Sequence, residues 1–583
     1  KTLVGQVQGP GEERRPSAKG APESLPQLRA RLINTARQRV FGLVLAFVAL
    51  ALVAMEQIVW LGSGSSASSS RPIASSLIPD RGEITDRNGV PLARAHPAYA
   101  LYFRPEAMQD GGSPLVRSPT EIASQLKTIF PRLDEVETAR KLASGEKGYL
   151  LRRILPEEAN AVFALGEVAV QTPREMDRHY PQGRLASHVL GRVIENNDGV
   201  KVGAFGIEKA LDATLTDDIT RATPQALSID VRVQGALEDE MLRGMRLAKA
   251  DGAAGLVLDV DTGEVLAMAS LPDFDPNRVS QEDADNTKNR ASYVTGELGS
   301  VFKPLTIAAA IDAGFLTNLN RKWDATTIEA GGRVFNDFED KGPELTIPEA
   351  LAFSSNTVTM RVSEKLGSDA LRAKWLELGM DAKPELEIQA RGEPLFPKGD
   401  WDEVTTKTAS YGHGFNVTPL HLANAYAAMV NGGIFRPATL LKVKPGDEER
   451  GKRVFKASTS LKMRQLLRLV ALHGTGAKAD ATGFRVGGKT GSAEKWVGTH
   501  YSTTRIISTF AAAFPMDRPR YVVVVSLDEP KITHAMAGRT AYYNAAPIVG
   551  NVISRTGPML GVKPDNHRDV DISDLDHLVK KKK

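Results

Sequence analysis

The chain has 583 residues, and its 74 lysines and arginines nearly balance its 70 aspartates and glutamates. This length predicts several domains with a large core, and the net charge of +4 does not indicate nucleic-acid binding. The chain has no cysteine, which excludes disulfides and a thiol nucleophile. We find no nucleotide-binding glycine pattern and no cluster of metal ligands, so we expect no cofactor and no metal, and we interpret His179, His188 and His413 as structural residues.

The first predicted element is a membrane anchor at residues 40–61, which read VFGLVLAFVALALVAMEQIVWL. As a helix this stretch would be roughly 33 Å long, about one bilayer. A cleaved signal peptide would have a shorter apolar core behind a short basic start, and the uniform apolarity argues against a buried helix of a soluble protein. The stretch is preceded by Arg29, Arg31, Arg37 and Arg39 and followed by the uncharged GSGSSASSS. The positive-inside rule therefore predicts a cytoplasmic N-terminus with the rest of the chain outside.

The two ends of the chain are polar. Residues 1–39 are expected to form a disordered cytoplasmic tail, and residues 566–583 a solvated C-terminal tail. Because the sequence begins with Lys1 rather than methionine, we do not expect it to include the natural start. Glu56 lies near the outer end of the predicted span, where a carboxylate is costly unless it reaches the interface or meets a partner in the membrane.

Short motifs and turn signals follow the anchor. Ser118-Pro-Thr-Glu121 is a capping box that predicts a helix start. Four further segments are interpreted as turns and strand ends with structural roles; they are Arg81–Gly89, Arg178–Gly183, Gly203–Glu208 and Leu227–Asp230. No catalytic residue is expected among them.

A second domain is predicted from about residue 246. Thr262-Gly263 joins two apolar segments in a β-hairpin, residues 255–261 and 264–270. Residues 505–514 and 521–527 predict two late strands, and a strand before them carries Lys489. Helical segments lie between these strands, one of them starting at Thr418-Pro419 and ending at Asn431-Gly-Gly433. Strands at both ends with helices between them predict an α+β fold in which helices sandwich an antiparallel sheet.

Three motifs in this domain carry the chemistry: Ser300-Val-Phe-Lys303, Ser354-Ser-Asn356 and Lys489-Thr-Gly-Ser492. Pro304 is tolerated only in or near a first turn, so a helix should start near Ser300 and place Lys303 on the same face. Taken alone, Ser300 could be a helix cap, and Ser-x-x-Lys also occurs at Ser124, Ser144 and Ser492. The order and spacing of the three motifs favour catalysis at Ser300.

These motifs resemble those of the penicillin-recognising serine enzymes, S-x-x-K, S-D-N and K-T-G. The middle motif has the Ser-Ser-Asn form of many peptidoglycan transpeptidases, and Ser492 stands where those enzymes usually have threonine. The four earlier segments, in the same order, resemble the N-terminal pedestal of class B penicillin-binding proteins. The resemblance covers residues 71–560 and implies a pedestal (dimerisation-type) domain at 62–245 and a transpeptidase domain at 246–565. No stretch resembles the glycosyltransferase domain of class A proteins.

The resemblance also implies roles for the motif residues. Ser300 is the nucleophile, and Lys303, neutral because its pKa is depressed, takes the proton of Ser300. Ser354 relays a proton to the leaving amine, Asn356 holds the substrate amide, and Lys489 stays charged. Lys489, Thr490 and Ser492 bind the terminal carboxylate, beside Gly491. Backbone N–H groups of Ser300 and Ser492 form the oxyanion hole.

By the same resemblance the substrate is a peptidoglycan stem peptide ending in D-Ala-D-Ala, and β-lactams inhibit by acylating Ser300. Short resemblances at residues 489–495 and 521–531 point to the septal type, in the bacterial inner membrane with a periplasmic catalytic domain. The implied partners are a polytopic glycan polymerase and other divisome proteins. Three alternatives stay open: a side-wall elongation transpeptidase, a D,D-carboxypeptidase or β-lactamase-like hydrolase, and a catalytically silent division scaffold.

Overall fold

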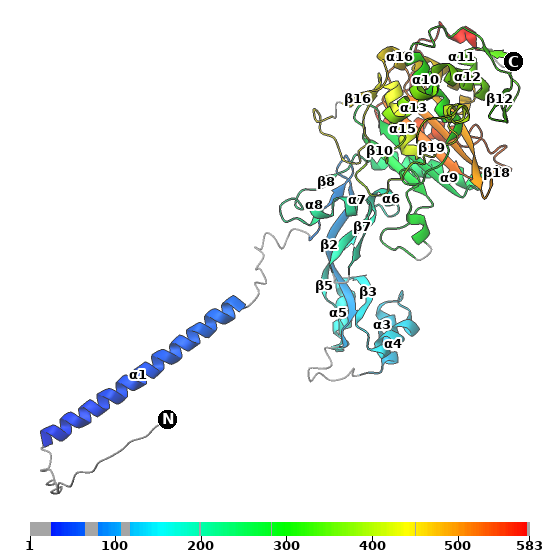
Figure 1. The fold of residues 1–583 in the computed structure, drawn as a ribbon. Coiled ribbons are helices and arrows are strands. Elements are labelled where there is room, and N and C mark those ends of the chain that lie inside the picture. The colour runs from blue at the N-terminus through cyan, green and yellow to red at the C-terminus, as the bar shows by residue number, and fades with distance from the viewer. Residues whose placement is uncertain are drawn as a thin grey trace, which may run out of the picture. The chain divides into compact units, whose positions relative to one another are not determined.

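The computed structural model describes residues 25–64, 80–105, 117–196, 200–280, 283–448 and 451–579. The chain divides into two units, Lys1–Leu77 and Ile78–Lys583 (Figure 1). The expectations for residues 1–24, for the linker at 65–79 and for residues 580–583 lie outside the described residues, as does the side chain of Glu56.

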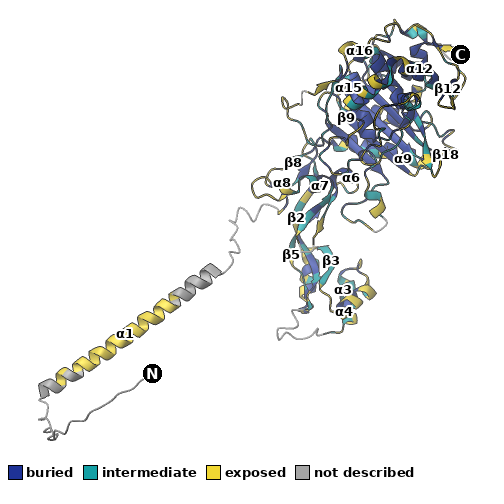
Figure 2. Cartoon of the chain, viewed as in Figure 1, coloured by how far each residue is buried: buried dark blue, intermediate teal, exposed yellow. Residues whose placement is uncertain are grey.

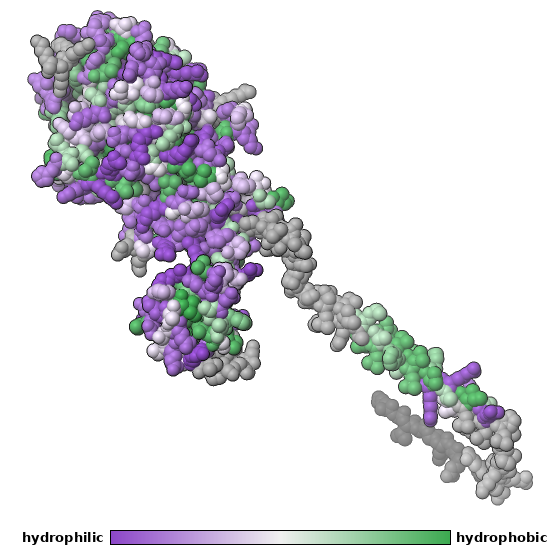
Figure 3. Space-filling model, turned by 180° about the vertical axis from the view of Figure 1, so that it is seen from behind, coloured by the Kyte–Doolittle hydropathy of each residue, from purple (hydrophilic) through white to green (hydrophobic). Residues whose placement is uncertain are grey.

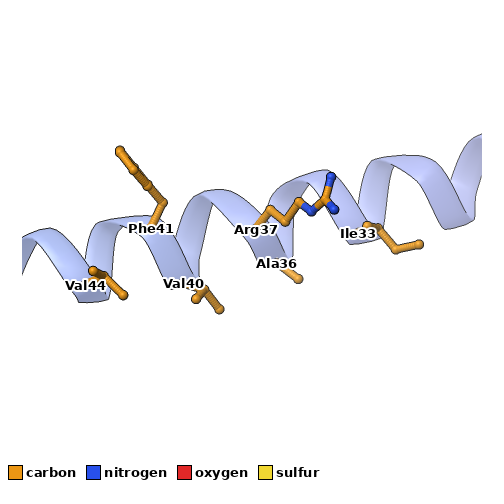
Figure 4. A pocket seen from close by; sticks show the side chains of 6 residues that line it. All are labelled: Ile33, Ala36, Arg37, Val40, Phe41 and Val44. Atoms are coloured by element: carbon orange, nitrogen blue, oxygen red, sulfur yellow. The ribbon is translucent and has the colours of Figure 1, made fainter.

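The first unit contains one long helix, α1 (Leu25–Gly64). Among the described residues it is the one helix long and apolar enough to cross a bilayer, with an apolar window at Ile33–Val53. Its described side chains are exposed and mostly apolar, with hydrophilic ones near its N-terminal end (Figures 2 and 3). Figure 4 shows six of them, including Arg37 and Phe41 one turn apart. Residues 25–39 were expected to be disordered; that expectation is wrong, because α1 begins at Leu25 and runs through them into the apolar window.

The pedestal is built on one irregular sheet. Its strand order is β3-β2-β1-β8, with β4 and β5 also pairing with β2, and β6 and β7 form a separate two-stranded sheet. The long strand β2 (Pro91–Phe103) is the centre of the arrangement. The other elements are β1 (Ile84–Thr85), α3 (Pro119–Ile129), α4 (Glu135–Ser144), β3 (Gly148–Ile154), α5 (Pro156–Phe163), β4 (Val170–Gln171), β5 (Arg174–His179), α6 (Ser187–Leu190), β6 (Arg192–Glu195), β7 (Lys201–Phe205), α7 (Gly206–Ala210), α8 (Asp212–Thr216) and β8 (Gln225–Ala226).

Three of the four segments singled out in the sequence, those with Arg81, Arg178 and Glu208, meet at the buried carboxylate of Glu208. Its two oxygens accept hydrogen bonds from Nε of Arg81 and Nε of Arg178, each at 2.6 Å. Gly206, with φ +68°, sits so close to Gly191 that a Cβ would lie 2.5 Å from the Gly191 nitrogen. A buried charge is costly unless it is paired, so these residues act together as a structural unit.

The catalytic domain contains a five-stranded antiparallel sheet in the order β10-β9-β19-β18-β17. The predicted hairpin is confirmed, since β9 and β10 pair in antiparallel register. Along β19, Val522 and Val524 enter one core cluster while Val523 and Val525 enter the other, as the two-residue period of a strand requires. The strands are β9 (Gly252–Asp259), β10 (Val265–Leu271), β17 (Gly487–Val497), β18 (His500–Phe514) and β19 (Tyr521–Asp528).

Helices cover both faces of this sheet, which confirms the predicted fold class (Figures 1 and 2). α9 (Val231–Ala248) and α17 (Ala545–Met559) pack on one face. The other face carries α10 (Lys303–Asp312), α11 (Ile347–Ala352), α12 (Asn356–Leu366), α13 (Ser368–Glu377), α14 (Glu403–Ser410), α15 (Pro419–Val430) and α16 (Ala457–His473). Short elements connect them: η2 (Ala284–Thr287), η3 (Gly299–Phe302), β11 (Trp323–Asp324), β12 (Ile328–Ala330), β13 (Arg333–Phe335), β14 (Glu344–Leu345), β15 (Ile434–Phe435), β16 (Lys452–Arg453), η4 (Ala477–Ala479) and η5 (Asp576–Leu578).

Two expected boundaries differ from the structure. α9 contributes Val233, Leu237 and Met241 to the core beneath the sheet, so the catalytic domain begins before residue 246. The C-terminal segment is no solvated tail up to residue 579, because Val570, Leu575 and Val579 are buried in the main core.

Candidate active site

The nucleophile candidate Ser300 lies in the 3-10 turn η3, and α10 begins directly after it at Lys303. The helix therefore starts three residues later than Ser300. In a 3-10 turn, residues three apart lie on the same side, so Ser300 and Lys303 face the same way. Ser300 is partly exposed, whereas Lys303 is fully buried.

Distant segments hold this turn in place. The Gly299 amide donates to Gly412 O at 3.1 Å, and a Cβ on Gly412 (φ +84°) would lie 2.2 Å from Gly299 O. Tyr426 donates its hydroxyl to Val301 O at 2.7 Å. The Phe302 ring packs edge-to-face on Phe415. None of these contacts was foreseen, since no short motif signals a pairing between segments so far apart in the chain.

The structure brings Lys303, Ser354 and Lys489 into direct contact. Lys303 Nζ donates to Ser354 O at 2.5 Å and to Ser354 Oγ at 3.2 Å. Lys489 Nζ donates to the same Oγ at 2.9 Å and to Thr490 O at 2.9 Å. Ser354 has a φ of +63°, which is strained for a residue other than glycine. Strained backbone conformations of this kind cluster at functional sites. Among the described residues Ser300 Oγ has no hydrogen bond to Lys303, a contact that in such sites often forms only with substrate.

Burial changes the pKa values of the two amines, Lys303 and Lys489. It lowers the pKa of Lys303 to about 7, while the carboxylate of Asp337 opposes the change. Burial also lowers the pKa of Lys489 well below its usual value, and the charge of Lys303 lowers it further. Positive charges on Lys303 and Lys489 would repel each other across this one buried hydroxyl. Burial therefore depresses the pKa of Lys303, as expected, and it acts on Lys489 in the same direction; the charge on Lys489 stays a prediction.

The strand β17 runs along the Ser300 turn. A Cβ on Gly491 would lie 2.3 Å from Leu298 O, so only glycine allows this approach. Thr490 donates its hydroxyl to Thr475 Oγ1 at 2.7 Å, and Ser492 Oγ accepts from the Ala541 amide at 3.2 Å. The backbones of Ser300 and Ser492, the expected oxyanion donors, therefore belong to neighbouring segments.

Asn356 lies in the first turn of α12, which Ser355 caps by accepting from the Val358 amide. Its side chain donates to Asn336 O at 3.3 Å, and among the described residues it makes no hydrogen bond to either lysine. The expected role of Asn356 in holding a substrate amide is therefore not visible in its present contacts.

The three histidines interpreted as structural all have protein partners. His188 Nε2 lies 2.6 Å from Asn286 O, and burial lowers its pKa to about 4. His179 contacts Asn277 Oδ1 at 3.1 Å. His413 Nδ1 lies 2.9 Å from Glu297 Oε2, beside the Ser300 turn.

Both domains match known protein families. The family described as penicillin binding protein transpeptidase domain matches residues 253–554, and the penicillin-binding protein dimerisation domain matches residues 76–222. A protein of Caulobacter vibrioides named as a probable peptidoglycan D,D-transpeptidase, FtsI, is 36% identical over 92% of this chain and 90% of its own length. The chain is a class B penicillin-binding protein of the FtsI-like type.

Two further comparisons agree with this assignment. The peptidoglycan D,D-transpeptidase FtsI of Escherichia coli is 29% identical to this class B protein, over 83% of this chain and 84% of its own length. The crystal structure of a peptidoglycan synthetase from Bifidobacterium adolescentis superposes with a TM-score of 0.62 at 24% identity, covering 85% of this chain and 98% of that one. This second likeness concerns the fold alone.

Asp337 is a residue of this class B site that the sequence analysis missed. Its Oδ1 accepts from the amides of Asn356 at 2.6 Å and Thr357 at 3.0 Å, so it anchors the start of α12. Its carboxylate is also the anion that raises the pKa of Lys303 against the effect of burial. A single aspartate in a polar loop gives no sequence signal of either contact.

Replacing Asp337 with asparagine is expected to shift the pH dependence of penicillin acylation. Asparagine retains an oxygen that can accept from Asn356 and Thr357, but it removes the negative charge that raises the pKa of Lys303. In a plot of the acylation rate constant against pH, the acidic limb, where the rate rises as Lys303 loses its proton, should therefore move to lower pH. The measurement is the second-order acylation rate constant across the acidic and neutral range, and an unmoved limb would contradict the assigned role. Asp337→Ala serves as the comparison that removes the acceptor as well.

Proposed function

We propose that the chain is the septal peptidoglycan D,D-transpeptidase of its cell, acting through an acyl-enzyme on Ser300. The observation that carries the proposal is the pair of buried amines, Lys303 and Lys489, that share Ser354 Oγ beside the Ser300 turn. A depressed lysine pKa next to a partly exposed serine is what nucleophilic attack at neutral pH requires.

The first half-reaction transfers the acyl group to the enzyme. Neutral Lys303 takes the proton of Ser300, and Ser300 Oγ attacks the carbonyl of the penultimate D-Ala. The backbone N–H groups of Ser300 and Ser492 stabilise the oxyanion, a contribution of roughly 3–4 kcal/mol for each donor. The peptide bond breaks, and the departing amine of the terminal D-Ala receives a proton through Ser354.

The second half-reaction consumes the ester. An amine of a neighbouring stem peptide attacks the acyl-enzyme carbonyl, loses a proton to the lysine pair, and forms the cross-link as Ser300 leaves with its hydroxyl restored.

Before either step, the donor peptide binds with its terminal carboxylate near Lys489, Thr490 and Ser492, and this anion would restore the charge of Lys489. Asn356 turns from Asn336 to the substrate amide. A β-lactam imitates the donor, and its ring opens on Ser300.

The alternatives are less well supported. A carboxypeptidase or β-lactamase-like enzyme would resolve the same ester with water, and a silent scaffold would not need the two buried amines. The relatives are named D,D-transpeptidases, and the FtsI name favours the septum over side-wall elongation.

Depletion of the protein is expected to give filamentous cells with unfinished septa and normal width. Cell division would stop because septal cross-linking requires this enzyme, while elongation would continue. Phase-contrast microscopy with a fluorescent D-amino-acid label at division sites measures both effects, and re-expression of the intact chain is the control. Rounded cells that still divide would assign the enzyme to side-wall growth instead.

The chain is a single-pass protein of the inner membrane, with its N-terminus in the cytoplasm and its catalytic domain in the periplasm. Four arginines lie before the apolar window of α1 or at its N-terminal end, which supports this orientation. Glu56 lies near the outer end of the span, where a carboxylate is costly unless a partner satisfies it. A polytopic glycan polymerase of the divisome is the candidate for this membrane partner.

Protease added to spheroplasts is expected to digest the catalytic domain while a cytoplasmic marker protein stays intact. Immunoblotting against residues of α17 reports the digestion. Complete protection in intact spheroplasts, followed by digestion after lysis, would show that the orientation is reversed.

A further inference from the structure

A cavity of about 490 Å³ lies between the pedestal strands β3, β5 and β6 and the loop at residues 276–279. Among the described residues, its lining carries seven arginine or lysine side chains and two carboxylates, Asp177 and Glu195. The catalytic mechanism uses none of these residues. The cavity therefore has an excess of positive charge that the proposed reaction does not explain.

Some of these cations are already satisfied. Arg152 pairs with Glu195 at 2.5 Å, Arg153 pairs with Asp177, and Lys201 donates to Met176 O. Arg178 pairs through Nε with Glu208, yet its Nη2 is buried and has no hydrogen-bond partner among the described residues. An unpartnered buried guanidinium nitrogen is costly, so a ligand that accepts from it would be stabilised.

Two further arginines of the cavity lining have no carboxylate partner among the described residues. Arg192 on β6 and Arg278 in the loop both line the cavity, and neither has an ion pair among the described residues. Arg153 adopts a φ of +59° here, a strained value for a non-glycine residue. The planar fork of arginine matches a carboxylate or a phosphate with two parallel hydrogen bonds.

The rest of the lining distinguishes between these two anions. Leu151, Val193, Ile194 and Val279 supply apolar walls beside the arginines. A bare phosphate or pyrophosphate would leave these walls in contact with water, whereas a peptide can place apolar side chains on them and carboxylates on the arginines. The cavity volume is also in the range that holds a ligand of several residues rather than a small ion.

We infer that this pedestal cavity binds an acidic peptide segment, with carboxylates on Arg192 and Arg278 and apolar side chains against β3 and β6. Such a site would give the enzyme a docking point for a protein partner separate from its catalytic groups. The ligand class follows from the charge and the lining of the cavity, and it does not depend on the reaction at Ser300.

The test uses the full chain in detergent and a fluorescein-labelled hexapeptide of alternating glutamate and leucine. Fluorescence anisotropy should show binding that weakens as salt is added, and a peptide with glutamine in place of glutamate should bind at least about tenfold more weakly. The double variant Arg192→Glu/Arg278→Glu should also lose at least about tenfold in affinity.

The matched control is Arg243→Glu/Lys531→Glu, which makes the same charge change at two exposed positions outside the cavity. It should bind the peptide like the unaltered chain. Penicillin acylation should be unchanged in both double variants, which shows that they fold and separates this test from the proposed catalysis. Equal peptide affinity in the two double variants, absence of binding to the unaltered chain, or tighter binding of inorganic pyrophosphate than of the peptide would each overturn the inference.

Discussion

Replacing Ser300 with alanine is expected to abolish covalent labelling by penicillin. The proposed adduct is an ester to Ser300 Oγ. We propose Lys303 as the base and Ser354 as the proton relay, and these two residues are in contact beside the Ser300 turn, along which β17 runs. Intact-protein mass spectrometry of the unaltered chain should show one added penicillin, and Ser300→Ala should show none. Peptide mapping of the labelled chain should place the adduct on Ser300.

The other serines in Ser-x-x-Lys sequences provide matched controls. Ser124 on α3 and Ser144 at the end of α4 are exposed, and each lies in the pedestal away from the lysine pair. Ser124→Ala and Ser144→Ala should therefore be labelled like the unaltered chain. Ser492→Ala should still carry the label, because Ser492 Oγ bonds only to the Ala541 amide among the described residues. An adduct mapped to any of these three serines would contradict the assignment.

Local patterns accounted for the elements that the sequence predicted well. The hairpin at Thr262-Gly263 and the start of α15 at Thr418-Pro419 depend on turn and cap residues within a few positions, and both are present. The three motifs were found because their spacing is characteristic of a known family. The resemblance implied that the three motifs serve one site, but their contact at Ser354 Oγ was not predicted, since the three segments lie far apart in the chain.

Features that depend on distant partners could not be predicted in this way. The segment after residue 565 reads as polar, yet Arg468 on α16 pairs with Asp569, and His473 pairs with Asp576, and these contacts bring Val570 and Leu575 into the core. The pairing of Glu208 with Arg81 and Arg178 is equally non-local. Each of these residues alone resembles an ordinary surface charge, and only tertiary structure shows that it is paired.

The same limit applies to the protonation of the two buried lysines, Lys303 and Lys489. The sequence suggested one neutral and one charged amine, but burial affects Lys303 and Lys489 alike. What distinguishes them is their surroundings: Asp337 supports a charge on Lys303, whereas Lys489 lies on the strand that is proposed to meet the substrate carboxylate. Substitution by arginine, which stays charged, separates the two roles.

Lys303→Arg is expected to reduce penicillin acylation by about 10²–10⁴-fold, the usual contribution of a general base, because arginine cannot accept the proton of Ser300. Lys489→Arg is expected to lose only about 10–100-fold, because arginine can still donate hydrogen bonds to Ser354 and to a substrate carboxylate, although with a different geometry. Stopped-flow measurement of the acylation rate constant compares the two variants directly. Equal rates would contradict the separate roles of the two lysines.

The pH dependence gives the sharper test of this pair. The protonated amine cannot act as a base, so acylation by the unaltered chain should rise with pH and level off above about 7, where Lys303 loses its proton. In Lys489→Arg the permanent guanidinium charge beside Lys303 should lower the pKa of Lys303 further, and the acidic limb should move to lower pH. In Lys303→Arg this limb should disappear altogether. A limb that persists unchanged in Lys303→Arg would show that another group takes the proton of Ser300.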